Sequence, residues 1–171
     1  CDVPLRLPSM FVLRGSGLTL TPAANLSLAN LSRFTAMVML DHVSLSAVVG
    51  GVYDASAVSG IMAISIRGGG KNAVRSVRAL ANADAIVGIN QSPHAEVAFS
   101  DIGGASVMLV GRCVWLLSTS AALIHDNHIR NCTKHSLDFD AYTSSSAAYS
   151  NVVVDHGSEG IFVEETASGN F

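Results

Sequence analysis

The last part of the chain, residues 124–171, matches itself when it is shifted by 24 residues. Polar positions align with polar ones and apolar with apolar in these pairs: Asn127 and Asn151, Asn131 and Asp155, Leu137 and Ile161, Phe139 and Val163, and Asp140 and Glu164. A sequence repeat of about 20 to 50 residues is typical of solenoids, in which each unit buries its apolar face by stacking on its neighbours. This repeat constrains the fold more than any other feature of the sequence.

Short apolar segments that end at Gly, Pro, Asn or Asp recur along the rest of the chain. The residues that begin them follow one another about every 21 to 30 positions: Ile61, Ile86, Val107, Leu137 and Ile161. One solenoid turn needs about this length, because three short strands and three bends must close on themselves. Only residues 72–82 offer a helical alternative. We predict a single all-β domain over residues 1–171, a parallel solenoid of about six to seven coils.

Composition supports this fold and excludes some partners. Only 13% of the residues are charged and 49% are apolar, whereas the exposed faces of a helical domain would need more charge. The 13 acidic residues outnumber the 10 basic ones, and no basic stripe is present, so a nucleic-acid partner is not expected. The weakly charged run 107–124 contains Arg112 and predicts two buried strands rather than a membrane span.

Two segments resemble a known family. Residues 124–131 (IHDNHIRN) are similar to an I-x-x-N-x-I-x-N turn segment, and residues 159–163 (EGIFV) to an x-G-I-x-V strand, of the pectin-lyase-like superfamily. The resemblance implies a right-handed parallel β-helix. It also implies a polysaccharide ligand and, for an enzyme, a lyase, hydrolase or epimerase. The motifs of the pectin-degrading branches are missing, which disfavours those branches.

The strand around residue 138 provides the best candidate chemistry. If Leu137 and Phe139 face the core, Asp138 and Asp140 point outward, and the 24-residue register places Glu164 beside Asp140. Close carboxylates raise one another's pKa or bind a cation such as Ca²⁺, and either property suits acid/base work on a sugar.

A histidine near these acids could act as the general base, and we select His156, which follows Asp155. The predicted catalytic set of an enzyme is therefore Asp138, Asp140, Glu164 and His156. The histidine spacings fit no compact metal motif, so no metal ligand is predicted, and Ca²⁺ is the one cofactor that suits the acids. A solvated acidic surface is the alternative interpretation.

Cysteines and sequons favour a secreted, extracellular protein. Cys113 and Cys132 lie close to one coil apart, so they could form a disulfide between neighbouring coils or remain two buried thiols. Sequons for N-glycosylation occur at Asn25, Asn30, Asn90 and Asn131. Asn127 and Asn151, with Asn170 further on, predict a stacked asparagine ladder with a structural role.

Two functions remain open. The first is an extracellular structural or glycan-associated module, and the second is a carbohydrate-active enzyme that uses the acidic residues above. The chain does not begin with Met, and both ends lie in strand-like sequence, so we expect an excerpt or mature segment of something longer. Such ends would continue into further chain or stack on another subunit. We therefore expect a fibre or a larger assembly.

Overall fold

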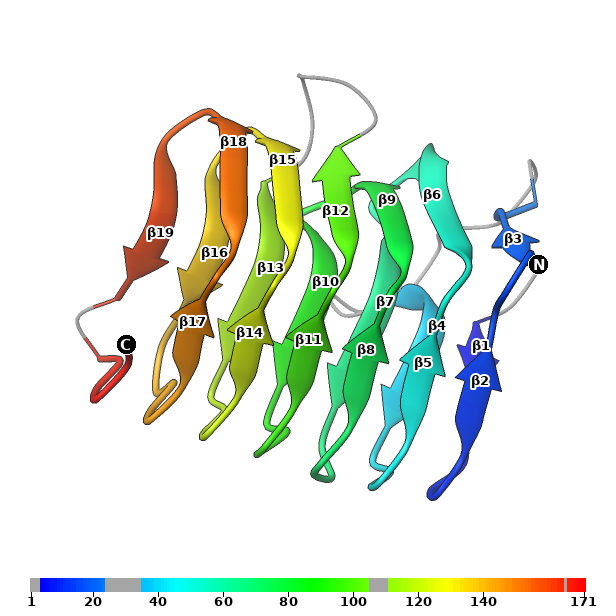
Figure 1. Cartoon of the computed structure of the whole chain (residues 1–171), viewed down its shortest axis with the longest axis horizontal. Coiled ribbons are helices and arrows are strands. Elements are labelled where there is room, and N and C mark those ends of the chain that lie inside the picture. The colour runs from blue at the N-terminus through cyan, green and yellow to red at the C-terminus, as the bar shows by residue number, and fades with distance from the viewer. Residues whose placement is uncertain (1–3, 24–34, 105–110, 165) are drawn as a thin grey trace.

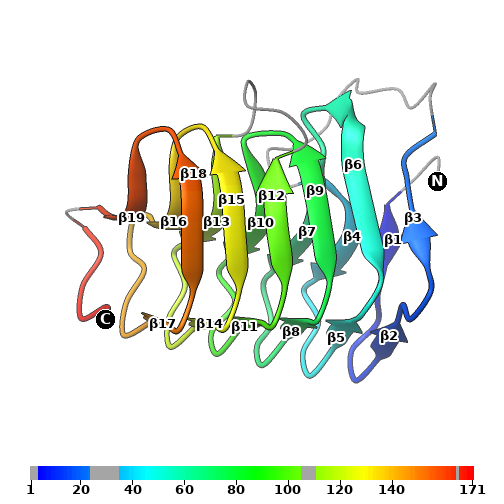
Figure 2. The same cartoon turned by 45° about the horizontal axis from the view of Figure 1, so that its top comes forward.

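The computed structural model describes residues 4–23, 35–104, 111–164 and 166–171. Throughout these residues every regular element is a β-strand and no helix is present. The strands form three parallel sheets that extend side by side along the axis of the solenoid, as Figures 1 and 2 show. The all-β parallel solenoid predicted from the sequence is therefore confirmed, while its right-handed sense and its number of coils stay predictions.

Sheet A contains the first strand of each turn, and its members pair in chain order. They are β1 (Leu5–Arg6), β4 (Ala36–Asp41), β7 (Met62–Arg67), β10 (Ala85–Asn90), β13 (Arg112–Leu117), β16 (His135–Phe139) and β19 (Glu159–Val163).

Sheets B and C contain the second and third strands of the turns. Sheet B consists of β2 (Val12–Arg14), β5 (Ala47–Val49), β8 (Ala73–Arg75), β11 (Glu96–Ala98), β14 (Leu123–His125) and β17 (Ala147–Tyr149). Sheet C consists of β3 (Thr19–Leu20), β6 (Val52–Ser59), β9 (Arg78–Asn82), β12 (Asp101–Gly104), β15 (His128–Cys132) and β18 (Val152–His156).

The 24-residue register of the last turns is confirmed residue by residue. Leu137 pairs with Ile161 and Asp138 with Phe162 in sheet A. The same spacing recurs in sheet C. The predicted helical alternative at residues 72–82 is wrong, because this segment forms β8 and β9 instead.

Aliphatic side chains stack inside the solenoid, one per turn. In sheet A the inward row contains the register partners Val38, Ile64, Val87, Val114 and Leu137, all fully buried. Burying a side chain of this size contributes about 1.5 to 3 kcal/mol. The core of this fold is therefore a continuous column of stacked side chains inside the solenoid, rather than a layer between two packed elements.

The inward row ends differently in β19. The repeat aligns Ile161 and Val163 with Leu137 and Phe139 and so predicts that they face the core, yet they are 54% and 50% exposed. Their register partners Leu137 and Phe139 are buried. The physical reason is that, within the described residues, no strand pairs with the far side of β19, so its inward side chains lack a covering turn.

The asparagine ladder forms at the bend between sheets B and C. The amide of Asn127 donates to Val97 O at 2.9 Å and to Asn151 Oδ1 at 3.0 Å, and Asn151 donates to Ile124 O at 2.8 Å. Asn170 lies instead at the bend between sheets A and B, where its Oδ1 accepts from Ser146 N at 2.9 Å. It belongs to a different ladder, because each bend needs its own partners for backbone groups.

A disulfide joins Cys113 to Cys132, with their Cα atoms 5.6 Å apart. Cys113 lies near the start of β13 and Cys132 at the end of β15, so the bond closes a single turn on itself. Both sulfurs are in the core. The sequence left open a bridge between neighbouring coils or two buried thiols. A bridge is present, but it lies within one turn, because Cys132 ends the third strand of the turn that Cys113 begins.

Candidate functional site

The candidate acids lie on the outward side of sheet A, where consecutive turns place related side chains in rows. One row contains Trp115, Asp138 and Phe162 as register partners. The row beside it contains Arg112, His135 and Glu159. The outward direction predicted for Asp138 follows from this register, because its neighbours Leu137 and Phe139 are in the core.

Outward direction does not make these acids exposed. Asp138 is only 1% exposed and Asp140 only 8%, so the alternative interpretation, a solvated acidic surface, is wrong for these two residues. The reason is that long side chains of the preceding turn lie against them. Arg112 pairs with Asp138, and the Trp115 indole donates from Nε1 to Asp140 Oδ2 at 2.7 Å.

Arg112 is the central cation of the site. Its guanidinium forms an ion pair with Asp138 and a second one with Asp84, at 3.0 Å from Nη1 to Oδ1. It also lies 4.8 Å from the centroid of the Trp115 ring, within cation–π range. Burial raises the pKa of Asp138, and the neighbouring Arg112 opposes this increase only in part.

Asp140 and Glu164 share a hydrogen bond between neighbouring turns, and we call them the dyad. Burial raises the pKa of Asp140, but hydrogen bonds from the Ala141 N–H, Glu164 and Trp115 outweigh burial and hold that pKa below its usual range. The hydrogen bond to Asp140 raises the pKa of Glu164, and desolvation and the charge of Asp140 add to the increase. The two opposite shifts favour a proton on Glu164 and an ionised Asp140.

An aromatic surface lies next to the dyad. The rings of His135 and Phe162 stack with centroids 4.3 Å apart and an interplanar angle of 10°. Phe162 is partly exposed and lies two positions before Glu164, on the same side of the strand, at roughly 7 Å. His135 Nδ1 also lies 2.8 Å from Glu159 Oε2.

His156 is not brought to the dyad. It ends β18, is exposed, and has its Nδ1 3.2 Å from Ser158 O. The five residues of β19 separate it from Glu164, a span of roughly 16 Å. It lines instead a separate pocket of about 400 Å³ with Asn131, Asp155 and neighbouring residues.

The other predicted positions have mixed outcomes. Asn25 and Asn30 lie outside the described residues. Asn90 and Asn131 are partly buried at the ends of β10 and β15, and their glycosylation stays a prediction. Among the described residues no group of three or more His, Cys, Asp or Glu side chains could hold a metal ion, so Ca²⁺ stays a prediction without a ligand set. A search of the described residues for a membrane-spanning helix finds none.

Sequence reasoning missed Arg112, Trp115 and His135 as parts of the site. A signal was present in the sequence, because one charged residue, Arg112, and one large aromatic residue, Trp115, interrupt a strand of otherwise aliphatic and small residues. The missing information was the register between β13 and β16, which places Arg112 beside His135 and Trp115 beside Asp138. That register differs from the 24-residue repeat by one position.

Comparisons with known proteins leave the family open. No family model matches the chain, and no curated protein matches it. One solved structure, described as a putative glycosyl hydrolase from Parabacteroides merdae, is 10% identical, with a TM-score of 0.47 over 98% of this chain and 76% of that chain. Identity this low bears on neither the reaction nor the ligand. The chain is a parallel β-solenoid, and its place in the pectin-lyase-like superfamily stays a prediction.

Proposed function

We propose that this chain is a carbohydrate-active hydrolase in which the Asp140–Glu164 dyad transfers the protons. One observation supports this above the others: two carboxyl groups in contact have pKa values pushed in opposite directions. Such a pair assigns the acid and the base of a reaction. Glu164 is the acid and Asp140 the base.

The hydrogen bond suggests how the dyad works. It places the carboxyls closer than the roughly 5 Å or more that separates the two acids of most glycosidases, so the dyad resembles a pair that shares one proton. Asp140 accepts a proton from the attacking water, whose oxygen bonds to the anomeric carbon. Glu164 gives its proton to the leaving oxygen as the glycosidic bond breaks. The dyad then holds one proton again, now on Asp140. Transfer of this proton to Glu164 across the hydrogen bond restores the starting state.

The surrounding residues position the dyad and the substrate. Trp115 fixes one oxygen of Asp140 and the Ala141 N–H fixes the other, at 2.7 and 2.6 Å. Partly exposed Phe162 offers a flat apolar face on which one face of a sugar ring can pack. This ring is the feature that favours a carbohydrate.

Hydrolysis of a panel of polysaccharides, followed by the release of reducing ends, tests the proposal. We expect Asp140→Asn and Glu164→Gln each to lower the rate by about 10²- to 10⁴-fold, the usual contribution of a positioned acid or base. Asp155→Asn is the matched control, because it neutralises an exposed carboxylate of the same turns. Activity that survives both dyad substitutions would exclude this mechanism, as would a wild-type chain that hydrolyses no member of the panel.

A second candidate is an extracellular structural module, favoured by the exposed inward residues of β19. We propose that a second copy of the chain covers Ile161 and Val163, since uncovered strands readily pair with others. Glycans on Asn90 and Asn131 would accompany secretion. Light scattering should show concentration-dependent assembly that Ile161→Arg abolishes. A mass that stays monomeric at every concentration argues against assembly through this surface.

A further inference from the structure

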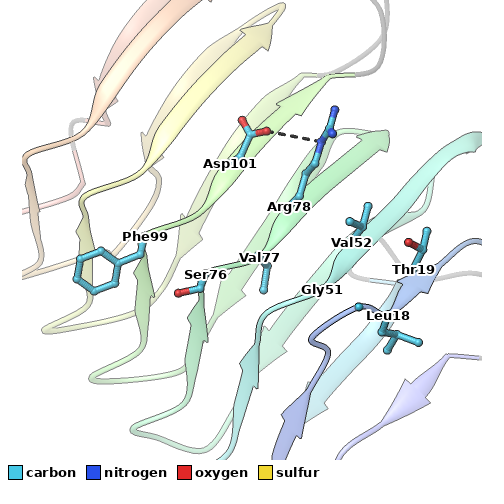
Figure 3. Close-up of a pocket in the computed structure, with 10 residues that line it drawn as sticks. Leu18, Thr19, Gly51, Val52, Ser76, Val77, Arg78, Phe99 and Asp101 are labelled. Atoms are coloured by element: carbon cyan, nitrogen blue, oxygen red, sulfur yellow. Dashed lines mark ion pairs between the residues drawn. The ribbon is translucent and has the colours of Figure 1, made fainter.

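A groove lies at the bend between sheets B and C, whereas the dyad lies at the end of strands of sheet A (Figure 3). It has a volume of about 430 Å³ and crosses four successive turns. Its lining residues are Gly17, Leu18, Thr19, Gly51, Val52, Ser76, Val77, Arg78, Phe99 and Asp101. Figure 3 shows Leu18 and Thr19 at one end, Phe99 at the other, and Arg78 with Asp101 along one side.

Arg78 is incompletely paired. Asp101 is already held by Arg130, whose Nε and Nη2 donate to its two oxygens at 3.1 and 3.0 Å, while His128 Nδ1 lies 3.4 Å away. Arg78 Nε is left 3.6 Å from the same carboxylate, beyond hydrogen-bond distance. Asp101 thus holds Arg130 by hydrogen bonds and Arg78 only by a longer ion pair, while Arg130 also lies in the field of Asp155. Arg78, beside the groove, is the less tightly held of the two guanidinium groups.

Other arginines in the described residues show what full pairing looks like. Arg67 donates to both oxygens of Asp41 at 2.9 and 3.3 Å, and Arg75 donates to both oxygens of Glu96. Arg78 has no comparable partner, and its side chain is 54% exposed. A guanidinium with free donors is suited to bidentate contact with a carboxylate or a sulfate.

Phe99 is the second unusual feature. It lies at the bend with a φ of 54°, a conformation that is costly for a bulky residue, and the residue is 59% exposed. In the other turns small or polar residues take this position with positive φ: Gly50, Ser76, Asp126 and Ser150. Bulky residues with positive φ also occur at the bend between sheets A and B, at Leu45 and Tyr142, so the feature particular to Phe99 is an exposed aromatic ring at the bend that lines the groove.

The ring of Phe99 begins an aromatic row that extends the groove. It meets His125 edge-on, with centroids 5.5 Å apart, and His125 stacks on Tyr149 at 4.9 Å and 3°. These rings come from successive turns, at the spacing of neighbouring strands. From Thr19 to Tyr149 the groove and the row cross five turn-to-turn intervals, roughly 24 Å at about 4.8 Å each.

We propose that this surface binds one strand of an acidic polysaccharide along the solenoid axis, with a carboxylate or sulfate group on Arg78 and ring faces on Phe99 and Tyr149. The preference for an anionic ligand comes from the exposed guanidinium of Arg78, which lies 3.6 Å from Asp101 in an ion pair without a hydrogen bond. The Thr19 and Ser76 hydroxyls offer hydrogen bonds to sugar hydroxyls, and Val52 and Val77 provide apolar walls. Only the choice of a sugar rests on the proposed function. The site holds the polymer on a different sheet from the dyad.

Titration calorimetry with three tetrasaccharides tests this site: one carries carboxylates, one carries sulfates and one is uncharged. Asp140→Asn is the background, so that turnover cannot disturb the measurement and loss of hydrolysis is scored separately from binding. We expect one or both acidic ligands to bind at least about ten-fold more tightly than the uncharged one, and the preferred ligand identifies the anion. Arg78→Ala should remove about ten-fold of that affinity and Phe99→Ala about five-fold.

Arg14→Ala is the matched control, because it removes an exposed arginine of β2 that does not line the groove. Its affinity should stay within about two-fold of the background. The proposal fails if Arg78→Ala, folded by circular dichroism, binds as well as the background. It also fails if the uncharged ligand binds equally well, or if inorganic sulfate alone binds as tightly as the sulfated tetrasaccharide. If the background binds an acidic tetrasaccharide and the wild-type chain hydrolyses none of the ligands, the groove proposal stands and the proposed catalytic role of the dyad fails.

Discussion

The outward faces of sheets A and C carry the same kind of ion pair in different surroundings. On sheet A, Arg112 and Asp138 are nearly buried, with side chains 9% and 1% exposed. On sheet C, Arg130 and Asp101 are 27% and 34% exposed. Both pairs connect adjacent turns and both point away from the core. Strand alternation therefore sets the direction of a side chain, whereas the neighbouring turns decide whether water reaches it.

This difference in burial predicts the largest effect on stability. Asp138→Ala leaves Arg112 without its buried partner, and breaking a buried pair in this way costs about 3 to 5 kcal/mol. Asp101→Ala should cost under about 1 kcal/mol, because solvent screens exposed charges. Urea unfolding of both variants measures the two free energies. Equal losses would show that burial does not separate the two faces.

The disulfide connects the same two sheets on their inward side, since Cys113 belongs to β13 of sheet A and Cys132 to β15 of sheet C. The bond closes a loop with a sequence separation of 19 residues. A loop of this size stabilises a fold by about 3 kcal/mol, chiefly by restricting the unfolded chain. We expect the double variant Cys113→Ala/Cys132→Ala to lose about that amount in urea unfolding. A reductant should lower the wild-type midpoint similarly and leave the variant unchanged.

The sequence predicted the fold well because a stacked turn repeats its own requirements. The match of Leu137 with Ile161 and the Asn127–Asn151 ladder both depend on one residue type at one spacing, and both are present in the structure. The site was predicted only in part. The hydrogen bond between Asp140 and Glu164 follows from the repeat, but the burial of Asp138 depends on Arg112 and Trp115, whose turn has another length. A periodic sequence gives direction and register without showing which neighbour covers which side chain.

The dyad predicts a smaller effect on stability, which depends on pH and arises on sheet A. The raised pKa of Glu164 means that its contribution to stability is complete at low pH and is lost as pH rises from its ordinary value of 4.5 through the raised value. The lowered pKa of Asp140 acts oppositely, with stability lost as pH falls below 3.8. Glu164→Gln should therefore remove the decrease in stability above pH 4.5.

The fluorescence of Trp115, the one tryptophan of the chain, can follow urea unfolding across this pH range. Glu159→Gln is the control, because the pKa of exposed Glu159 is lowered by its hydrogen bond with Ser158 and by His135. It should leave the decrease above pH 4.5 in place. An identical pH profile for Glu164→Gln and the wild type would mean that the dyad shares no proton.

The smallest expected effect is a gain in stability at the groove of sheets B and C. A side chain with positive φ costs about 1 to 2 kcal/mol, and glycine avoids this cost, although its freedom in the unfolded chain offsets part of the gain. Phe99→Gly should therefore be more stable than the wild type by up to about 1 kcal/mol, despite losing the contact with His125. Tyr149→Gly, at a position without positive φ, should be less stable. If both variants lose stability equally, Phe99 is held by packing. If Phe99→Gly gains stability and loses the acidic ligand, the strain is retained for binding.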